Sequence, residues 1–154
     1  MNRTLVLGVG NVLLMDEGIG VHVVRALDGR LPESAQALDG GTQSFALAAL
    51  IDATDGLIVV DAAEVGAAPG DVDVFEGEAM DRYCAAGPRR GVHEIALTDL
   101  LAAAALSDGL PARRALVGIR PQQIEWGDTP STEVADAIPK ACSEVLALIA
   151  RWAA

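Results

Sequence analysis

Apolar residues in this chain fall into short runs that are followed by glycine, by aspartate or by an Arg-Pro pair. Three such runs cover residues 5–7, 57–60 and 115–119. Short apolar runs bounded by turn-forming residues are typical of strands that are buried on both faces of a parallel sheet. A weaker run over residues 35–38, followed by the turn-forming residues 39–42, predicts a further strand.

One segment alternates between polar and apolar residues. Val72 and Val74 are interleaved with Asp71 and Asp73, and an alternation with period two indicates a strand with one buried face and one solvated face. We therefore expect this segment to form an antiparallel edge strand of an otherwise mostly parallel sheet.

Segments whose apolar residues recur at helical spacing lie between these strands. Val21, Val24 and Leu27 recur at helical intervals after Asp16, which stands where an N-cap is expected, and the helix is expected to end at residues 28–29. Further helices are expected over residues 44–52, 95–106 and 132–152.

Strands and helices that alternate in this way predict a single α/β domain over residues 1–154. We expect a three-layer sandwich, in which a five-stranded, mostly parallel, twisted sheet carries helices on both faces. Right-handed crossovers place the second and third strands on opposite sides of the first, in a flavodoxin-like order. Ligands in such sheets bind at the carboxyl ends of the strands, where the strand order reverses.

Composition and charge narrow the possible partners. The chain carries 22 acidic and 11 basic residues, for a net charge of −11, which disfavours nucleic acids and anionic membranes as partners. No segment approaches the roughly 20 apolar residues of a membrane span, and the N-terminus does not resemble a signal peptide. Cys84 and Cys142 lack the spacing of a disulfide framework or a zinc site. A cytoplasmic protein is expected.

Carboxylates follow the first strand. A dinucleotide site would present glycines and a helix N-terminus to phosphate there, but the G-x-G-x-x-G pattern is broken at Leu13 and no basic residue is adjacent. Glu17 comes just after the first strand and Asp61 ends the third. We expect these two side chains to face each other across the crevice, where a divalent cation would relieve their repulsion.

A histidine is expected to complete this site. His93 follows an irregular basic loop over residues 84–91 and precedes a predicted helix, so its imidazole is free to close the same crevice. Glutamate, aspartate and histidine ligands, with water in the open positions, suit nickel, zinc or a similar first-row ion. The sequence therefore predicts a metal site formed by Glu17, Asp61 and His93.

Five collinear segments stand out as motifs. They are Gly-Val-Gly-Asn-x4-Asp-Glu-Gly-Ile-Gly at residues 8–20, Asp-Gly-Gly-Thr at 39–42, Val-Val-Asp-Ala at 59–62, Val-His-Glu with Leu-x-Asp-Leu-Leu within 92–101, and Ala-Leu-Val-Gly-Ile-x-Pro at 115–121. Together they resemble the hydrogenase maturation proteases. The resemblance spans nearly the whole chain. It implies a monomeric endopeptidase that removes the C-terminal extension of a nickel–iron hydrogenase large-subunit precursor after nickel insertion.

The resemblance also implies roles for individual residues. Glu17, Asp61 and His93 would bind the nickel ion that the precursor already carries, and other divalent cations can substitute for it. The sequence shows no Ser-His-Asp, Cys-His or H-E-x-x-H arrangement. Hydrolysis would therefore use a metal-polarised water or carbonyl, or an aspartic-type mechanism with a carboxylate base. Asp16, Asp39 and Asp61 are all candidates for that base.

Other interpretations stay open at this point. Gly40, Gly41 and Thr42 form either a tight turn with a helix cap or a backbone surface that a substrate peptide can approach closely. Asp16 alone is more typical of a helix cap than of a ligand. For the whole chain, the alternatives are a nucleotide-binding protein and a non-catalytic partner that binds metal or precursor without cutting it.

Overall fold

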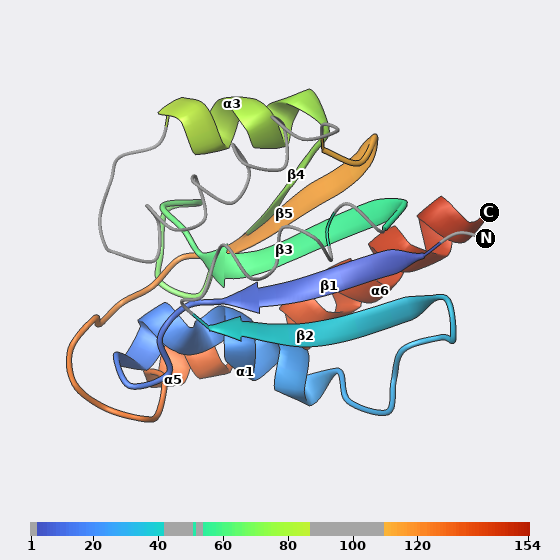
Figure 1. Cartoon of the computed structure of the whole chain (residues 1–154). Coiled ribbons are helices and arrows are strands. Elements are labelled where there is room, and N and C mark those ends of the chain that lie inside the picture. The colour runs from blue at the N-terminus through green and yellow to red at the C-terminus, as the bar shows by residue number, and fades with distance from the viewer. Residues whose placement is uncertain (1–2, 42–50, 52–53, 87–109) are drawn as a thin grey trace.

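The computed structural model describes residues 3–41, 51, 54–86 and 110–154, which form a five-stranded sheet in the order β2-β1-β3-β5-β4 (Figure 1). The strands are β1 (Thr4–Val9), β2 (Ala35–Gly41), β3 (Gly56–Ala62), β4 (Val72–Glu76) and β5 (Arg113–Ile119). All neighbouring strands are parallel except β4, which pairs with β5 in the antiparallel direction at one edge. The predicted α/β class, the places of β2 and β3 on either side of β1, and the antiparallel edge strand are confirmed. The flavodoxin-like order is wrong for the last two strands, because β5 lies next to β3 and β4 forms the edge.

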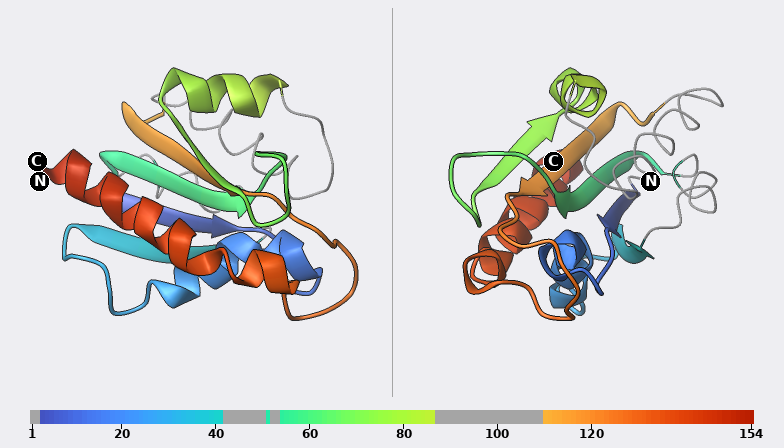
Figure 2. Two further views of the ribbon diagram at one scale, coloured as in Figure 1. Left: turned by 180° about the vertical axis from the view of Figure 1, so that it is seen from behind. Right: turned by 90° about the vertical axis from the view of Figure 1, so that its left-hand side faces the viewer.

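Both faces of the sheet are covered, which explains the continuous apolar runs. Every residue of β1 and β3 is buried, and successive side chains point to opposite faces. Val6 and Ile58 pack in a cluster with residues of α1 and α6, whereas Leu7 and Val59 pack in a second cluster with Met80 of α3. Figure 2 shows α1 and α6 on one face and α3 on the other.

The helices differ from the expected ones in two places. They are η1 (Met15–Gly18, a 3₁₀ turn), α1 (Ile19–Ala26), α3 (Glu78–Ala86), α5 (Thr132–Ala135) and α6 (Ile138–Ala153). The expected loop over residues 84–91 is wrong at residues 84–86, because these belong to α3. The expected final helix is divided at residues 136–137, just before Pro139 in the first turn of α6. The helices predicted over 44–52 and 95–106 lie outside the described residues, except for Ile51, which is helical.

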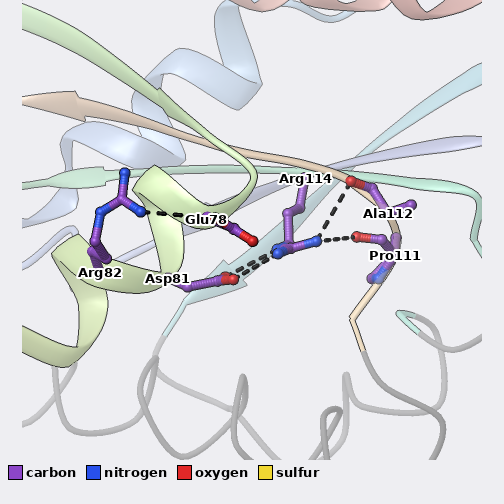
Figure 3. A network of polar contacts seen from close by, with 6 residues as sticks. All are labelled: Glu78, Asp81, Arg82, Pro111, Ala112 and Arg114. Carbon is purple, nitrogen blue, oxygen red and sulfur yellow. Dashed lines mark hydrogen bonds and ion pairs between the residues drawn. The ribbon is translucent and has the colours of Figure 1, made fainter.

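Polar and aromatic contacts fix α3 to the edge of the sheet. Nε of Arg114 donates to Oδ1 of Asp81 at 2.9 Å and Nη2 donates to Oδ2 at 2.5 Å, while Nη1 donates to the carbonyl of Pro111 at 3.2 Å (Figure 3). The rings of Phe75 in β4 and Tyr83 in α3 stack with their centroids 4.7 Å apart. This helix is therefore held over β4 and β5.

The carboxyl ends of β1, β2 and β3 meet at one edge of the sheet, which we call the carboxyl edge (Figure 1). Residues 120–131, between β5 and α5, form the long connection that curves past this edge. None of the helices in the described ranges combines the length and apolar character that a membrane span requires.

Candidate active site

Two buried carboxylates lie at the carboxyl edge. Glu17 in η1 is 6% exposed, and Asp61 near the end of β3 is 2% exposed. β1 and β3 are neighbours, with Gly8 opposite Val60, and η1 contacts β3. The structure therefore places Glu17 and Asp61 at the same end of two adjacent strands, which is the arrangement that the topology predicts.

Glycines allow η1 to pack directly on the strand ends. A Cβ added to Gly20 would lie 2.0 Å from the carbonyl oxygen of Val60, the residue before Asp61. A Cβ added to Gly10, whose φ is +127°, would lie 1.9 Å from the carbonyl oxygen of Glu17. Side chains cannot occupy these positions without moving the backbone. The two glycines therefore set the position of the Glu17 backbone relative to the end of β3.

The described residues supply only part of the predicted metal site. Oδ1 of Asp61 accepts a hydrogen bond from the N–H of Ala62 at 2.8 Å. Among the ranges that the structure describes, no three His, Cys, Asp or Glu side chains form a metal-binding cluster. His93, the third predicted ligand, lies outside those ranges. Glu17 and Asp61 are thus the two predicted ligands whose places are known.

Asp16 is fully buried and bonds to the connection after β5. Oδ2 of Asp16 accepts hydrogen bonds from the N–H groups of Gln122 and Gln123, both at 2.8 Å, and from the hydroxyl of Ser131 at 2.7 Å. Oδ1 accepts one from the N–H of Ser131 at 2.7 Å. Burial by itself raises the pKa of Asp16, but the bonds from Gln123, Ser131 and Gln122 outweigh it and the pKa lies below its ordinary value.

The expected N-cap role of Asp16 is wrong. Gly18 occupies the N-cap position of α1, and Asp16 lies inside η1. The carboxylate therefore holds the 120–131 connection against η1, immediately before Glu17 in the chain. Sequence reasoning missed Gln122, Gln123 and Ser131, because a hydrogen bond between residues more than a hundred positions apart leaves no local pattern.

The predicted residues at the end of β2 lie on the same edge. Asp39 is partly exposed, and its Oδ2 lies 3.6 Å from Nη2 of Arg25 in α1. Gly40 is buried and falls at an irregularity in the pairing, since Gly8 pairs with Asp39 but the next residue of β1 pairs with Gly41. Thr42 lies outside the described residues. The structure thus places Asp39, Gly40 and Gly41 at the end of the strand that flanks β1.

A cysteine and a histidine have shifted pKa values for reasons of burial. Burial, together with the negative charges of Asp81 and Asp61, raises the pKa of Cys84 to about 11, so its thiol is protonated at neutral pH and is a poor nucleophile. Burial and the charge of Arg25 lower the pKa of His22. Its Nε2 atom is buried and has no hydrogen-bond partner among the residues that the structure describes.

Comparison with known proteins identifies the family. The model of the HycI family, described as hydrogenase maturation protease, matches residues 21–148. This chain belongs to that family. It is 37% identical to the hydrogenase 2 maturation protease of Escherichia coli, over 96% of this chain and 90% of the relative. It is 34% identical to the hydrogenase expression/formation protein HupD of Rhizobium leguminosarum bv. viciae, over 97% of this chain and 75% of the relative.

A solved structure supports the same assignment. The hydrogenase maturating endopeptidase HybD from Escherichia coli matches with a TM-score of 0.87 and 34% identity, over 97% of this chain and 93% of the other. The resemblance predicted from the five motifs is confirmed, and the chain is a peptidase of the hydrogenase maturation protease family. The nucleotide-binding alternative is accordingly set aside.

Proposed function

We propose that this protein removes the C-terminal extension from the large-subunit precursor of a nickel–iron hydrogenase after nickel has been inserted. The observation that carries the proposal is the pair of buried carboxylates, Glu17 and Asp61, at the carboxyl edge of a chain in this protease family. The nickel ion belongs to the substrate, and Glu17, Asp61 and His93 bind it when the precursor docks.

The chemistry of these side chains suits this role. Carboxylate oxygens and an imidazole nitrogen bind first-row divalent ions of intermediate hardness. Two buried carboxyl groups at adjacent strand ends form a site that a dication stabilises, because the cation offsets the repulsion between their negative charges. Because the ion arrives only with a loaded precursor, cleavage depends on the completion of nickel insertion. Other divalent cations can occupy the same ligands.

Among the three candidate bases, the surroundings favour Asp61. The carboxylate of Asp16 accepts four hydrogen bonds from the 120–131 connection, and Asp39 is partly exposed beside Arg25. We assign Asp61 the proton transfer: a water oxygen attacks the scissile carbonyl carbon while Asp61 accepts the water proton. That proton then passes to the leaving amine as the C–N bond breaks. Asp16 is a positioning residue in this scheme.

The direct test compares nickel-loaded and nickel-free precursors. Each is incubated with the purified protein, and the masses of the products are measured. We expect the loaded precursor to be shortened by a C-terminal peptide and the nickel-free precursor to stay intact. Equal cleavage of both forms contradicts the nickel requirement, and binding without shortening of the loaded form indicates a non-catalytic partner.

Single substitutions test the residue assignments. Glu17→Gln and Asp61→Asn keep the size of each side chain and remove its charge, and His93→Ala removes the imidazole. Each should abolish processing while the protein remains folded, as checked by urea unfolding. Asp73→Asn is the matched control, because Asp73 is exposed on β4. This variant should process the precursor at the rate of the unaltered protein.

A further inference from the structure

Three large apolar side chains are exposed at the carboxyl edge. In the ranges that the structure describes, the exposed large hydrophobic residues are Leu13 at 54%, Ile124 at 44% and Trp126 at 80%. Leu13 lies between β1 and η1, and the other two lie in the 120–131 connection. We call these three residues the apolar patch.

Backbone pairing brings the two segments of the patch together. Leu14 and Gly127 form an isolated parallel β-bridge, so Leu13 and Trp126, the residues before them, lie side by side. The N–H of Gly127 donates to the carbonyl of Leu13 at 2.9 Å, and the N–H of Met15 donates to the carbonyl of Gly127 at 2.9 Å. Two distant segments therefore meet at the patch, with Leu13 beside Trp126.

The fold holds this surface firmly. Asp16 accepts hydrogen bonds from Gln122, Gln123 and Ser131 on both sides of the patch, and its own N–H donates to the carbonyl of Gln123 at 3.1 Å. Exposed apolar side chains on a backbone that is fixed in this way are typical of sites for a binding partner.

The patch and the candidate active site share a segment of the chain. Leu13 and Glu17 belong to the same segment after β1, and Asp16 joins that segment to the connection that carries Trp126. Because Leu13 lies four residues before Glu17, a polypeptide that reaches Glu17 can also reach the segment that carries Leu13.

We propose that the apolar patch is the docking surface for the hydrogenase precursor, and that an apolar segment of the precursor packs against Trp126. This inference rests on the proposed function. Glu125 and Asp128 flank Trp126 and are exposed, and the net charge is −11, which disfavours anionic lipid and nucleic acid on this surface. Three side chains form a small contact, as expected for a protease that releases its substrate.

Two variants of Trp126 test the docking surface. Trp126→Ser removes the apolar ring, and Trp126→Phe retains an aromatic side chain as the matched control. For the nickel-loaded precursor, the serine variant should raise KM on the order of tenfold with kcat unchanged, whereas the phenylalanine variant stays near the unaltered protein. Leu13→Ser should raise KM in the same sense. Because these side chains are exposed, urea unfolding should change little.

The outcomes separate this inference from the proposed function. If the unaltered protein shortens the precursor and Trp126→Ser has the same KM as Trp126→Phe, the docking surface is wrong and the proposed function stands. If the unaltered protein does not shorten the precursor, both fall. Sedimentation measures the oligomeric state as a further outcome. If the unaltered protein is a dimer, and Trp126→Ser is a monomer with an unchanged KM, the patch is a self-association surface and the inference is overturned.

Discussion

Asp16 and Ser131 are 115 residues apart in the chain, yet one carboxylate accepts hydrogen bonds from both the backbone N–H and the hydroxyl of that serine. The contact joins η1 to the segment that leads into α5. Glu17 is the next residue after Asp16, so the contact couples the position of Glu17 to the 120–131 connection. The order of the strands alone does not fix the path of that connection.

Removal of this carboxylate should destabilise the protein. Asp16→Ala leaves the N–H groups of Gln122, Gln123 and Ser131 without their acceptor, and we expect a loss of about 2–3 kcal/mol in the free energy of unfolding, measured in urea. Asp39→Ala is the control, because an exposed ion pair with Arg25 contributes roughly 0–1 kcal/mol. Equal losses for the two variants would mean that the Asp16 contacts contribute little.

The contribution of Asp16 should also depend on pH. Since the folded-state pKa of Asp16 is lowered, its ionised form stabilises the folded protein above the unfolded-state pKa, and this contribution is lost as the pH falls through the folded-state pKa. The pKa values of Asp71, Glu76 and Asp81 are lowered as well, so the whole protein should lose stability in acid.

Comparison with Asp16→Asn isolates that one group. The difference in unfolding free energy between the unaltered protein and the variant should be constant from about pH 7 to pH 5, and should shrink below about pH 4. Urea unfolding at each pH measures it. A difference that stays constant down to about pH 2.5 would show that the Asp16 carboxylate does not titrate differently in the folded protein.

Gly20 should tolerate no side chain, although it lies in a helix. Alanine normally stabilises a helix relative to glycine by roughly 1 kcal/mol, but a Cβ at Gly20 would lie 2.0 Å from the carbonyl oxygen of Val60. We expect Gly20→Ala to lower the free energy of unfolding by about 1–3 kcal/mol and to reduce precursor processing, since it displaces Glu17 from the end of β3.

A second position in the same helix provides the comparison. Ala26 is the exposed last residue of α1, so Ala26→Gly should cost no more than about 1 kcal/mol and leave processing unchanged. If Gly20→Ala is as stable as the unaltered protein by urea unfolding, the close packing of α1 on β3 is not needed.

The fold was largely predictable because its determinants are local. The apolar runs of β1 and β3 and the alternation of Val72 and Val74 each specify a strand, and right-handed crossovers then place β2 and β3 on either side of β1. The placement of Glu17 and Asp61 at one edge follows, because Asp61 lies at the end of β3 and Glu17 lies in the segment that follows β1.

The missed features depend on contacts between distant segments. In α3, Met80 is fully buried, while Tyr83 and Cys84 are half-buried. This gives too few apolar positions for a clear helical period. The bonds from Asp16 to Ser131 leave no spacing pattern in the sequence. Trp126 is exposed in a segment that the bridge between Leu14 and Gly127 positions, and neither its apolar character nor its sequence neighbours predict that exposure.

The thiol of Cys84 reports on the charge of Asp61. Its pKa of about 11 arises first from burial and then from the charges of Asp81 and Asp61, so its alkylation by iodoacetamide should be slow at neutral pH. The alkylation rate should rise about tenfold per pH unit from pH 7.5 to beyond pH 9. The rate of an ordinary thiol, with a pKa of about 8.5, levels off in that range. Mass spectrometry of the labelled peptides distinguishes Cys84 from the fully buried Cys142.

Neutralising the nearby carboxylate should accelerate this reaction. In Asp61→Asn the negative charge that opposes thiolate formation is gone, so Cys84 should be labelled faster than in the unaltered protein at every pH below 9.5 or so. Asp73→Asn, which changes an exposed carboxylate on β4, should leave the rate unchanged. Equal labelling rates in Asp61→Asn and the unaltered protein would mean that Asp61 carries no charge near the thiol, which would also contradict its role as an ionised ligand and base.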